Sequence, residues 1–160
     1  MKQTLKLWML AAILTICGAT TVLTSCADAD EGESKADYEL RNTINGPAWR
    51  VHSVMKNDGT WSTGEDPAEF WFEVKFSASN HNFKSVRFYY KKGEADETTR
   101  EEYSSSDNTA YTIKDASIIE ATVDGKPYFR ITLKEKVTST MHCDLYFYNN
   151  NKTYEVKMWR

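Results

Sequence analysis

Apolar and polar residues alternate with a period of two along most of the chain beyond residue 44. In segment 70–77, a phenylalanine or valine at every even position alternates with Trp71, Glu73 and Lys75. Because successive side chains of a strand point to opposite faces, such alternation predicts strands that bury one face. The pattern predicts eight strands, at 49–55, 70–77, 83–91, 111–114, 118–123, 127–134, 140–148 and 153–159. We therefore expect an all-β fold: a single antiparallel, roughly eight-stranded up-and-down barrel or, as an alternative, a β-sandwich.

The last two predicted strands form a hairpin whose register can be predicted. Asn150-Asn151 suits a two-residue turn, because asparagine tolerates the positive φ angles that such a turn requires. That turn sets Leu145 opposite Val156 on the apolar face and Asp144 opposite Lys157 on the polar face.

The turn at Asp124-Gly125 is less regular. An Asp-Gly pair also favours a two-residue turn, but that register would not bring apolar residues together. Matching Ala121 with Phe129 and Ile119 with Ile131 needs a bulge or one more loop residue, and we expect the apolar match to hold.

The segments around the predicted strands are polar and acidic. Residues 27–44 lack hydrophobic periodicity, so residues 26–43 are predicted to be an acidic flexible tether that precedes a barrel domain at 44–160. The acids between Glu94 and Glu102 have irregular spacing and are interrupted by Arg100, which predicts a solvated loop and no calcium site.

The amino-terminal segment has the pattern of an export signal. Lys2 and Lys6 precede an uncharged apolar run that ends in Leu23-Thr24-Ser25-Cys26, which resembles a bacterial lipobox. The resemblance implies a signal peptide at 1–25 and lipidation of Cys26. The protein would then be anchored to a membrane of the bacterial cell envelope, with the outer membrane, at its surface or periplasmic face, as the expected location.

The two ends of the predicted barrel resemble a known family. Gly46-Pro47-Ala48-Trp49 opens the first strand, and segment 153–160 closes the last one with Trp159-Arg160. These pieces are similar to the lipocalin-like domain of Bacteroidota-type lipoproteins, a calycin-like β-barrel, although the motif here is Gly-x-x-Trp and not Gly-x-Trp. The resemblance implies that Trp49 closes the base of the barrel and that Arg160 stacks on it.

Charge and composition exclude several classes of function. The chain carries a net charge of −3, and removal of residues 1–25, with two lysines and no acid, makes it −5. Such a balance argues against a nucleic-acid partner. The three histidines lack metal-site spacing, and no catalytic motif is present, so we expect no metal, no cofactor and no enzymatic activity. Cys143 lies among alternating apolar residues, which favours a small buried residue over a reactive thiol.

Aromatic residues provide the candidate binding sites. The first hypothesis is a small apolar ligand inside the barrel, bound by four residues predicted to face inward: Phe72, Phe76, Phe88 and Tyr90. The second is a filled barrel that binds a glycan or another protein through aromatics on the outer face: Trp71, Tyr89, Tyr146, Tyr148 and Trp159. Both hypotheses give the protein a binding function in the envelope.

Overall fold

The computed structural model describes residues 32–63, 70–91 and 94–160. These residues form one α-helix, α2 (Lys35–Ile44), a short 3-10 helix, η1 (Ser105–Asp107), and nine strands of a single sheet. The strands are β1 (Ala48–Val54), β2 (Phe70–Ser77), β3 (Asn82–Lys91), β4 (Glu94–Tyr103), β5 (Thr109–Lys114), β6 (Ile118–Val123), β7 (Lys126–Leu133), β8 (Thr140–Phe147) and β9 (Lys152–Trp159).

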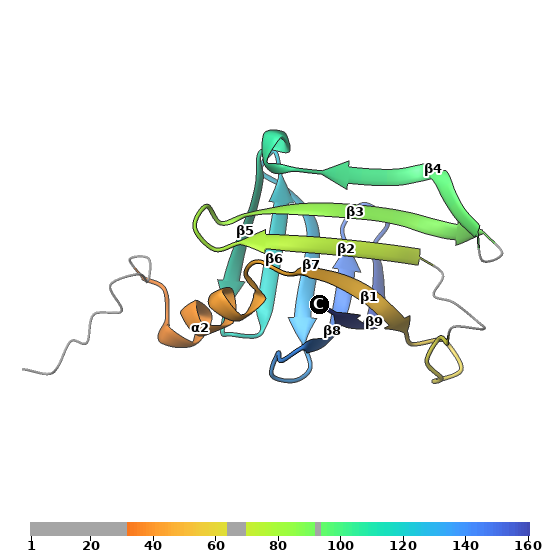
Figure 1. Ribbon diagram of the computed structural model, residues 1–160, viewed down its shortest axis with the longest axis horizontal. Helices are drawn as coiled ribbons and strands as arrows, with labels where there is room; N and C mark the ends of the chain where they lie inside the picture. The colour runs from red at the N-terminus through yellow and green to blue at the C-terminus, as the bar shows by residue number, and fades with distance from the viewer. Residues whose placement is uncertain (1–31, 64–69, 92–93) are drawn as a thin grey trace, which may run out of the picture. The chain divides into compact units, whose positions relative to one another are not determined.

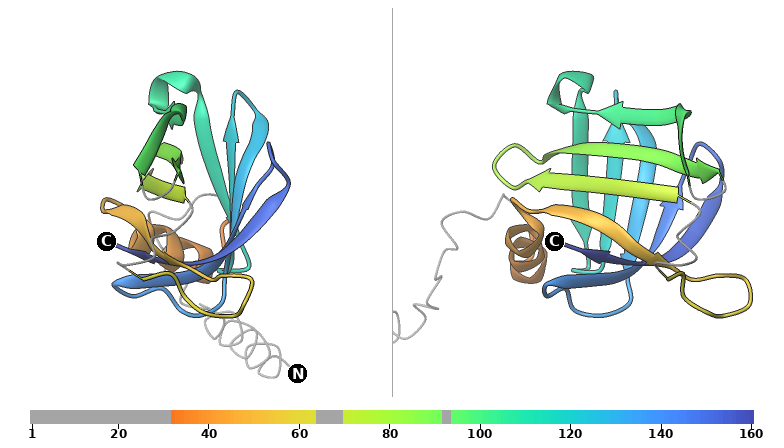
Figure 2. Two further views of the ribbon diagram at one scale, coloured as in Figure 1. Left: turned by 90° about the vertical axis from the view of Figure 1, so that its right-hand side faces the viewer. Right: turned by 45° about the vertical axis from the view of Figure 1, so that its right-hand side comes forward.

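The sheet is antiparallel throughout and nearly closed. Its strand order is β4-β3-β2-β1-β9-β8-β7-β6-β5, so the first and last strands pair and only β4 and β5 are edges (Figure 1). Figure 2 shows the two halves of the sheet facing each other across a common interior. Backbone contacts link β5 to the start of β3, where the Tyr111 amide donates to the His81 carbonyl at 2.8 Å. The predicted all-β barrel is confirmed, with nine strands where about eight were expected.

The additional strand is β4, at the segment that was predicted to be an acidic loop. Its sequence, EADETTREEY, has almost no apolar residues and therefore gives no alternating pattern. β4 pairs with β3 alone. Charged residues suit an edge strand because they discourage pairing with other chains, and this explains why the prediction was wrong.

Residues 35–43, predicted to belong to a tether, instead form most of α2. The helix begins after Ser34, whose side chain accepts a hydrogen bond from the Asp37 amide, and its buried residues are Leu40, Arg41 and Ile44. A charged residue on the buried face hides the apolar spacing that identifies a helix in sequence.

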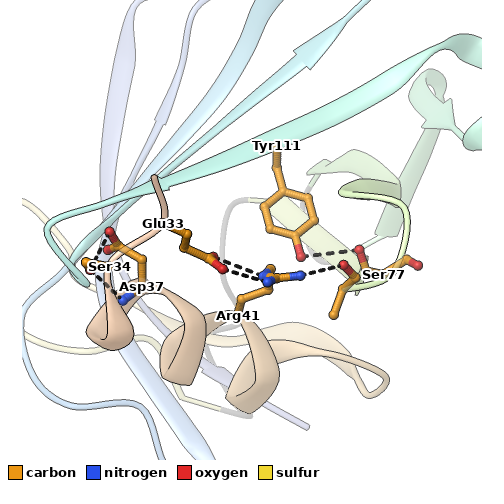
Figure 3. Close-up of polar contacts among 7 residues, drawn as sticks. Glu33, Ser34, Asp37, Arg41, Ser77 and Tyr111 are labelled. Atoms are coloured by element: carbon orange, nitrogen blue, oxygen red, sulfur yellow. Dashed lines mark hydrogen bonds and ion pairs between the residues drawn. The ribbon is translucent and has the colours of Figure 1, made fainter. Parts of the chain in front are cut away.

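Arg41 attaches α2 to the barrel. Its guanidinium forms a two-point ion pair with Glu33, at 3.0 Å from Nε and 2.6 Å from Nη2, and donates from Nη1 to the Ala78 carbonyl at 2.9 Å (Figure 3). Tyr111 on β5 donates to the Ser77 carbonyl beside this pair (Figure 3). The helix is therefore linked to the residue after β2 by Arg41, whose charge is balanced by Glu33 just before the helix.

The faces of β3 are the reverse of those predicted. Phe83, Ser85 and Arg87 are buried, whereas Phe88 is only half-buried and stacks on Trp71, with ring centroids 5.0 Å apart. Both faces of β3 carry aromatic residues, so alternation could not decide between them. The buried arginine is the charged residue that the prediction had placed outside.

The last hairpin has the predicted faces and a different register. Leu145 lies opposite Tyr154 and Asp144 opposite Glu155, a shift of two residues, and the loop spans residues 148–151. A shift of two preserves the face of every side chain, so the apolar pattern alone could not exclude it. Lys134 replaces Lys157 as the partner of Asp144, at 3.1 Å.

The β6–β7 hairpin combines the two features that its sequence predicted. Asp124 and Gly125 both have positive φ in a two-residue turn. Ala121 pairs with Phe129, Ile119 pairs with Ile131, and a bulge absorbs the extra residue. That residue is Tyr128, which the bulge turns into the core.

Candidate functional site

Phenylalanine rings fill much of the barrel interior. Phe72 contacts Phe129 and Phe147 edge-on, each at 5.3 Å between ring centroids, and Phe76 contacts Tyr111 at 5.0 Å. All of these rings are almost completely buried. Of the four residues predicted to bind a ligand, Phe72 and Phe76 therefore belong to the packed core.

The other two predicted ligand-binding residues do not join them. Phe88 lies on the outer face of β3, against Trp71, so its assignment to the interior is wrong. The side chain of Tyr90 lies outside the described residues. The four residues consequently do not form one site.

Arg87 occupies the interior position that sequence reasoning missed. Its side chain is 2% exposed, and its guanidinium carbon lies 4.0 Å from the centre of the Phe147 ring. The rings of Tyr89 and Tyr128 are farther, at 5.7 and 5.9 Å. The sequence signal was the alternation of Phe83, Ser85 and Arg87 on β3, which would have placed the arginine inside if that face had been chosen.

Glu101 on β4 is the counter-ion of Arg87. One carboxylate oxygen accepts from Arg87 Nη2 at 2.6 Å and from the Tyr128 hydroxyl at 3.3 Å. The other accepts from the Asn149 side-chain amide at 2.9 Å. Glu101 is thus held by three donors from three different parts of the fold.

Two nitrogens of Arg87 have no hydrogen-bond partner within the described residues. Nε and Nη1 are both buried and donate to no acceptor there. A buried donor without an acceptor costs about 1–3 kcal/mol, and more when it is charged. The interior therefore holds polar groups whose hydrogen bonds the described residues do not complete.

The surroundings of Arg87 are aromatic and close to solvent. Tyr89 and Tyr103 are only partly buried, and Asn150 of the β8–β9 loop donates to the Tyr89 hydroxyl at 2.9 Å. Burial raises the pKa of Tyr128 far above its usual value, although the charge of Arg87 opposes the rise. Burial also raises the pKa of Tyr103, to which the charge of Glu101 adds. Tyr103 and Tyr128 therefore keep their hydroxyl protons at physiological pH.

The aromatics predicted for an outer binding surface are divided among separate places. Tyr89 faces the interior and contacts Phe70, so the prediction that it shares an outer surface with Trp71 is wrong. Tyr146 and Tyr148 contact each other at 4.9 Å. Trp159 lies opposite Thr140, which is six residues before Tyr146 on β8. At strand spacing, six residues separate Trp159 from Tyr146 by roughly 20 Å.

Trp159 forms its own exposed group with His52. The two rings are stacked at 3.8 Å with an interplanar angle of 5°, and Trp159 is 49% exposed. Nearby on the same strand, the Lys157 amine lies 4.4 Å from the ring centre of Trp61. This is the outer surface that retains an exposed aromatic face.

A groove of about 700 Å³ lies between α2 and the segment that follows β7. Leu40, Leu133 and Val137 contribute apolar walls, and Lys134 lies at the rim. The Lys134 amine is paired with Asp144 at 3.1 Å and Glu155 at 3.0 Å, which raises the pKa of the lysine. None of the predicted site residues lines this groove.

The contact predicted at the base of the barrel is confirmed. The Arg160 guanidinium lies over the Trp49 ring at 5.7 Å from its centre. Trp49 is completely buried, and its indole nitrogen donates to the Ile44 carbonyl of α2 at 3.0 Å. Trp49 thus contacts both Arg160 and the end of α2.

Several other features bear on the class of protein. Among the residues described, there is no group of three metal-ligating side chains and no helix long and apolar enough to cross a membrane. Cys26 and residues 1–25, which are predicted to be a signal peptide, lie outside those residues. No protein-family model, curated protein or solved structure matches the chain. Its function must therefore be inferred from the site itself.

Proposed function

We propose that this protein is a non-enzymatic, lipid-anchored, lipocalin-like binding protein of the bacterial cell envelope. It binds a small and mostly apolar molecule inside the barrel, at Arg87. The anchor is Cys26, acylated after removal of residues 1–25. The barrel holds the ligand outside the cytoplasm and performs no chemistry on it.

The observation that carries this proposal is the buried Arg87, two of whose nitrogens have no acceptor among the residues that the structure describes. An apolar side chain of similar size would pack in the same place without the cost of burying a charge. An arginine there is useful if a ligand completes its hydrogen bonds. The aromatic shell supplies the apolar contacts, and it includes the half-buried Tyr89, whose ring centre lies 5.7 Å from the guanidinium carbon.

The proposal is tested on the Arg87 side chain directly. In full-length protein labelled with ¹⁵N-arginine, the Nε–H resonance of Arg87 is identified by its loss in Arg87→Met. We expect it to shift when a methanol extract of the host membranes is added. Arg130 is the control, because its Nε donates to Glu120 on the outer face at 2.6 Å and its resonance should stay in place. A shift at Arg130 without one at Arg87 would reject the interior site.

A second candidate function is glycan binding on the outer face. The observation that favours it is the exposed Trp159–His52 stack, because planar rings of this kind pack against sugar rings. Trp159→Ala should then abolish retention on immobilised envelope glycans while unfolding at nearly the wild-type urea concentration. Full retention by that variant would exclude this surface.

A further inference from the structure

We infer that the molecule bound at Arg87 presents an uncharged oxygen acceptor, such as an amide or ester carbonyl, and not a carboxylate. The inference rests on the proposed function and specifies the chemistry of the buried end of the ligand. It follows from three properties of Arg87: which of its donors are occupied, which rings surround them, and how its charge is balanced.

One two-donor edge of the guanidinium is unoccupied. A guanidinium has five N–H bonds in one plane, one on Nε and two on each terminal nitrogen. Glu101 occupies Nη2, and Nε and Nη1 have no acceptor in the part of the chain described. Nη2 carries a second hydrogen, which lies beside either the Nε–H or an Nη1–H. A ligand oxygen can therefore accept from two adjacent donors without displacing Glu101.

Aromatic rings surround the guanidinium. Its carbon lies 4.0 Å from the centre of the Phe147 ring and 5.7 and 5.9 Å from those of Tyr89 and Tyr128. N–H donors among apolar rings select an oxygen atom that projects from an apolar body.

The charge of Arg87 is already balanced. Glu101 forms an ion pair with it at 2.6 Å, and the donors Tyr128 and Asn149 hold the same carboxylate. A ligand carboxylate would place a second negative charge on one guanidinium, and two carboxylates that share a site repel. A carbonyl oxygen accepts the same hydrogen bonds without that repulsion. The Arg87–Glu101 pair thus favours a neutral acceptor.

The test compares two probes that differ in charge and little in shape: dansyl-labelled undecanoic acid and its primary amide. Their affinities are measured by fluorescence for the full-length protein near neutral pH. We expect the wild type to bind the amide about tenfold more tightly than the acid. Glu101→Gln removes the counter-ion and should change the amide-to-acid ratio by about tenfold or more in favour of the acid.

Glu120→Gln is the matched control for Glu101→Gln. Glu120 also pairs with an arginine that lies over a tyrosine ring, Arg130 over Tyr148, but on the outer face of the barrel. The probe preference should be the same in this variant as in the wild type. A wild-type preference for the acid, or an equal change in both glutamine variants, would overturn the inference.

Arg87→Met provides a second test of the inference if Glu101→Gln does not fold. It removes the donors and keeps the length of the side chain, so binding of the amide should weaken at least about tenfold. Unchanged amide binding would overturn the inference while leaving a barrel ligand in place. Absence of binding by either probe, together with an unmoved Arg87 resonance in the membrane-extract experiment, would reject the proposed function itself.

Discussion

At the scale of the residue, Arg87 places a charge where a methionine of similar length would pack against Phe147. Its ion pair with Glu101 is unequally buried, since Arg87 is 2% exposed and Glu101 is 31% exposed. Replacing a buried ion pair by apolar residues is often neutral or stabilising, whereas removing only the counter-ion leaves an uncompensated charge.

We expect Arg87→Met to unfold near the wild-type urea concentration, because the Glu101 carboxylate that it leaves behind is partly solvated and keeps Tyr128 and Asn149 as donors. Glu101→Gln should lose about 1–3 kcal/mol of unfolding free energy, less than a fully buried pair would lose because Glu101 is partly solvated. Urea unfolding followed by circular dichroism measures both changes. A large loss in Arg87→Met with none in Glu101→Gln would show that the arginine stabilises the fold and is not retained for a ligand.

Cys143 should be chemically inert in the folded protein. The residue is completely buried, and burial raises the pKa of its thiol well above the usual value, to which the charge of Asp144 adds. A thiol that is both inaccessible and protonated does not react as a nucleophile. Ellman's reagent should leave Cys143 unmodified in native protein and modify it in denaturant. Rapid modification without unfolding would contradict the burial of β8 in the core.

Tyr111 should make the fold sensitive to alkaline pH. Burial raises its pKa to about 12, and Arg41 opposes the rise. The folded chain therefore keeps this proton at a pH where the unfolded chain loses it. The resulting stability is present below about pH 10, the ordinary tyrosine value, and is lost as pH rises toward 12.

Tyr111→Phe removes this ionisation, so its stability should fall less steeply above pH 10 than that of the wild type. Unfolding in urea at a series of alkaline pH values gives the two slopes. Tyr146→Phe is the control, because Tyr146 lies on the outer face and donates to Asn151. Equal slopes for the wild type and Tyr111→Phe would contradict the buried position of the ring.

At the scale of the element, the buried Arg41 and its counter-ion Glu33 help to hold α2 against the barrel. The side chains of Arg41 and Glu33 are 8% and 13% exposed, whereas those of Arg50 and Glu73, also an ion pair, are 62% and 25% exposed. Arg41→Ala should cost about 2–5 kcal/mol, because it leaves Glu33 and the Ala78 carbonyl without their donor. Arg50→Ala should cost less than about 1 kcal/mol. Urea unfolding of the two variants tests the comparison, and equal losses would show that α2 is not held in this way.

Which elements the sequence could predict depended on how many faces of each strand were apolar. β6 and β7 have one apolar face, so the pairing of Ala121 with Phe129 and the need for a bulge could both be predicted. β3 has rings on both faces, and the choice of Phe88 over Arg87 as the inward residue was wrong. Period-two alternation identifies a strand, but it identifies its buried face only when the opposite face is polar.

The elements that the prediction missed are those in which charge replaces apolar pattern. β4 consists largely of charged residues because it is an edge, and α2 buries an arginine in place of an apolar residue. The candidate site lies where two predictions were wrong: the buried face of β3 and the charged strand β4. It joins Arg87 from β3, Glu101 from β4 and the Tyr128 bulge, and these come together only through tertiary packing.

At the scale of the whole molecule, we propose that the protein is anchored at Cys26 and carries a barrel with Arg87 in its interior. Cys26→Ala should prevent incorporation of a palmitate analogue that the wild type incorporates. Because one acyl chain alone binds only marginally, the multiple chains that lipidation at this cysteine would supply give stable retention. Incorporation of the analogue by Cys26→Ala would contradict anchoring through this residue.

The central claim is that the barrel carries a ligand at Arg87. The measurement that tests it most directly is native mass spectrometry of the full-length protein and its Arg87→Met variant, each purified under mild conditions from the organism that makes it. We predict an additional mass on the wild type that denaturation releases and that Arg87→Met lacks. The same additional mass on both proteins would place the ligand elsewhere, and a bare mass for both would contradict the claim that the barrel holds a ligand.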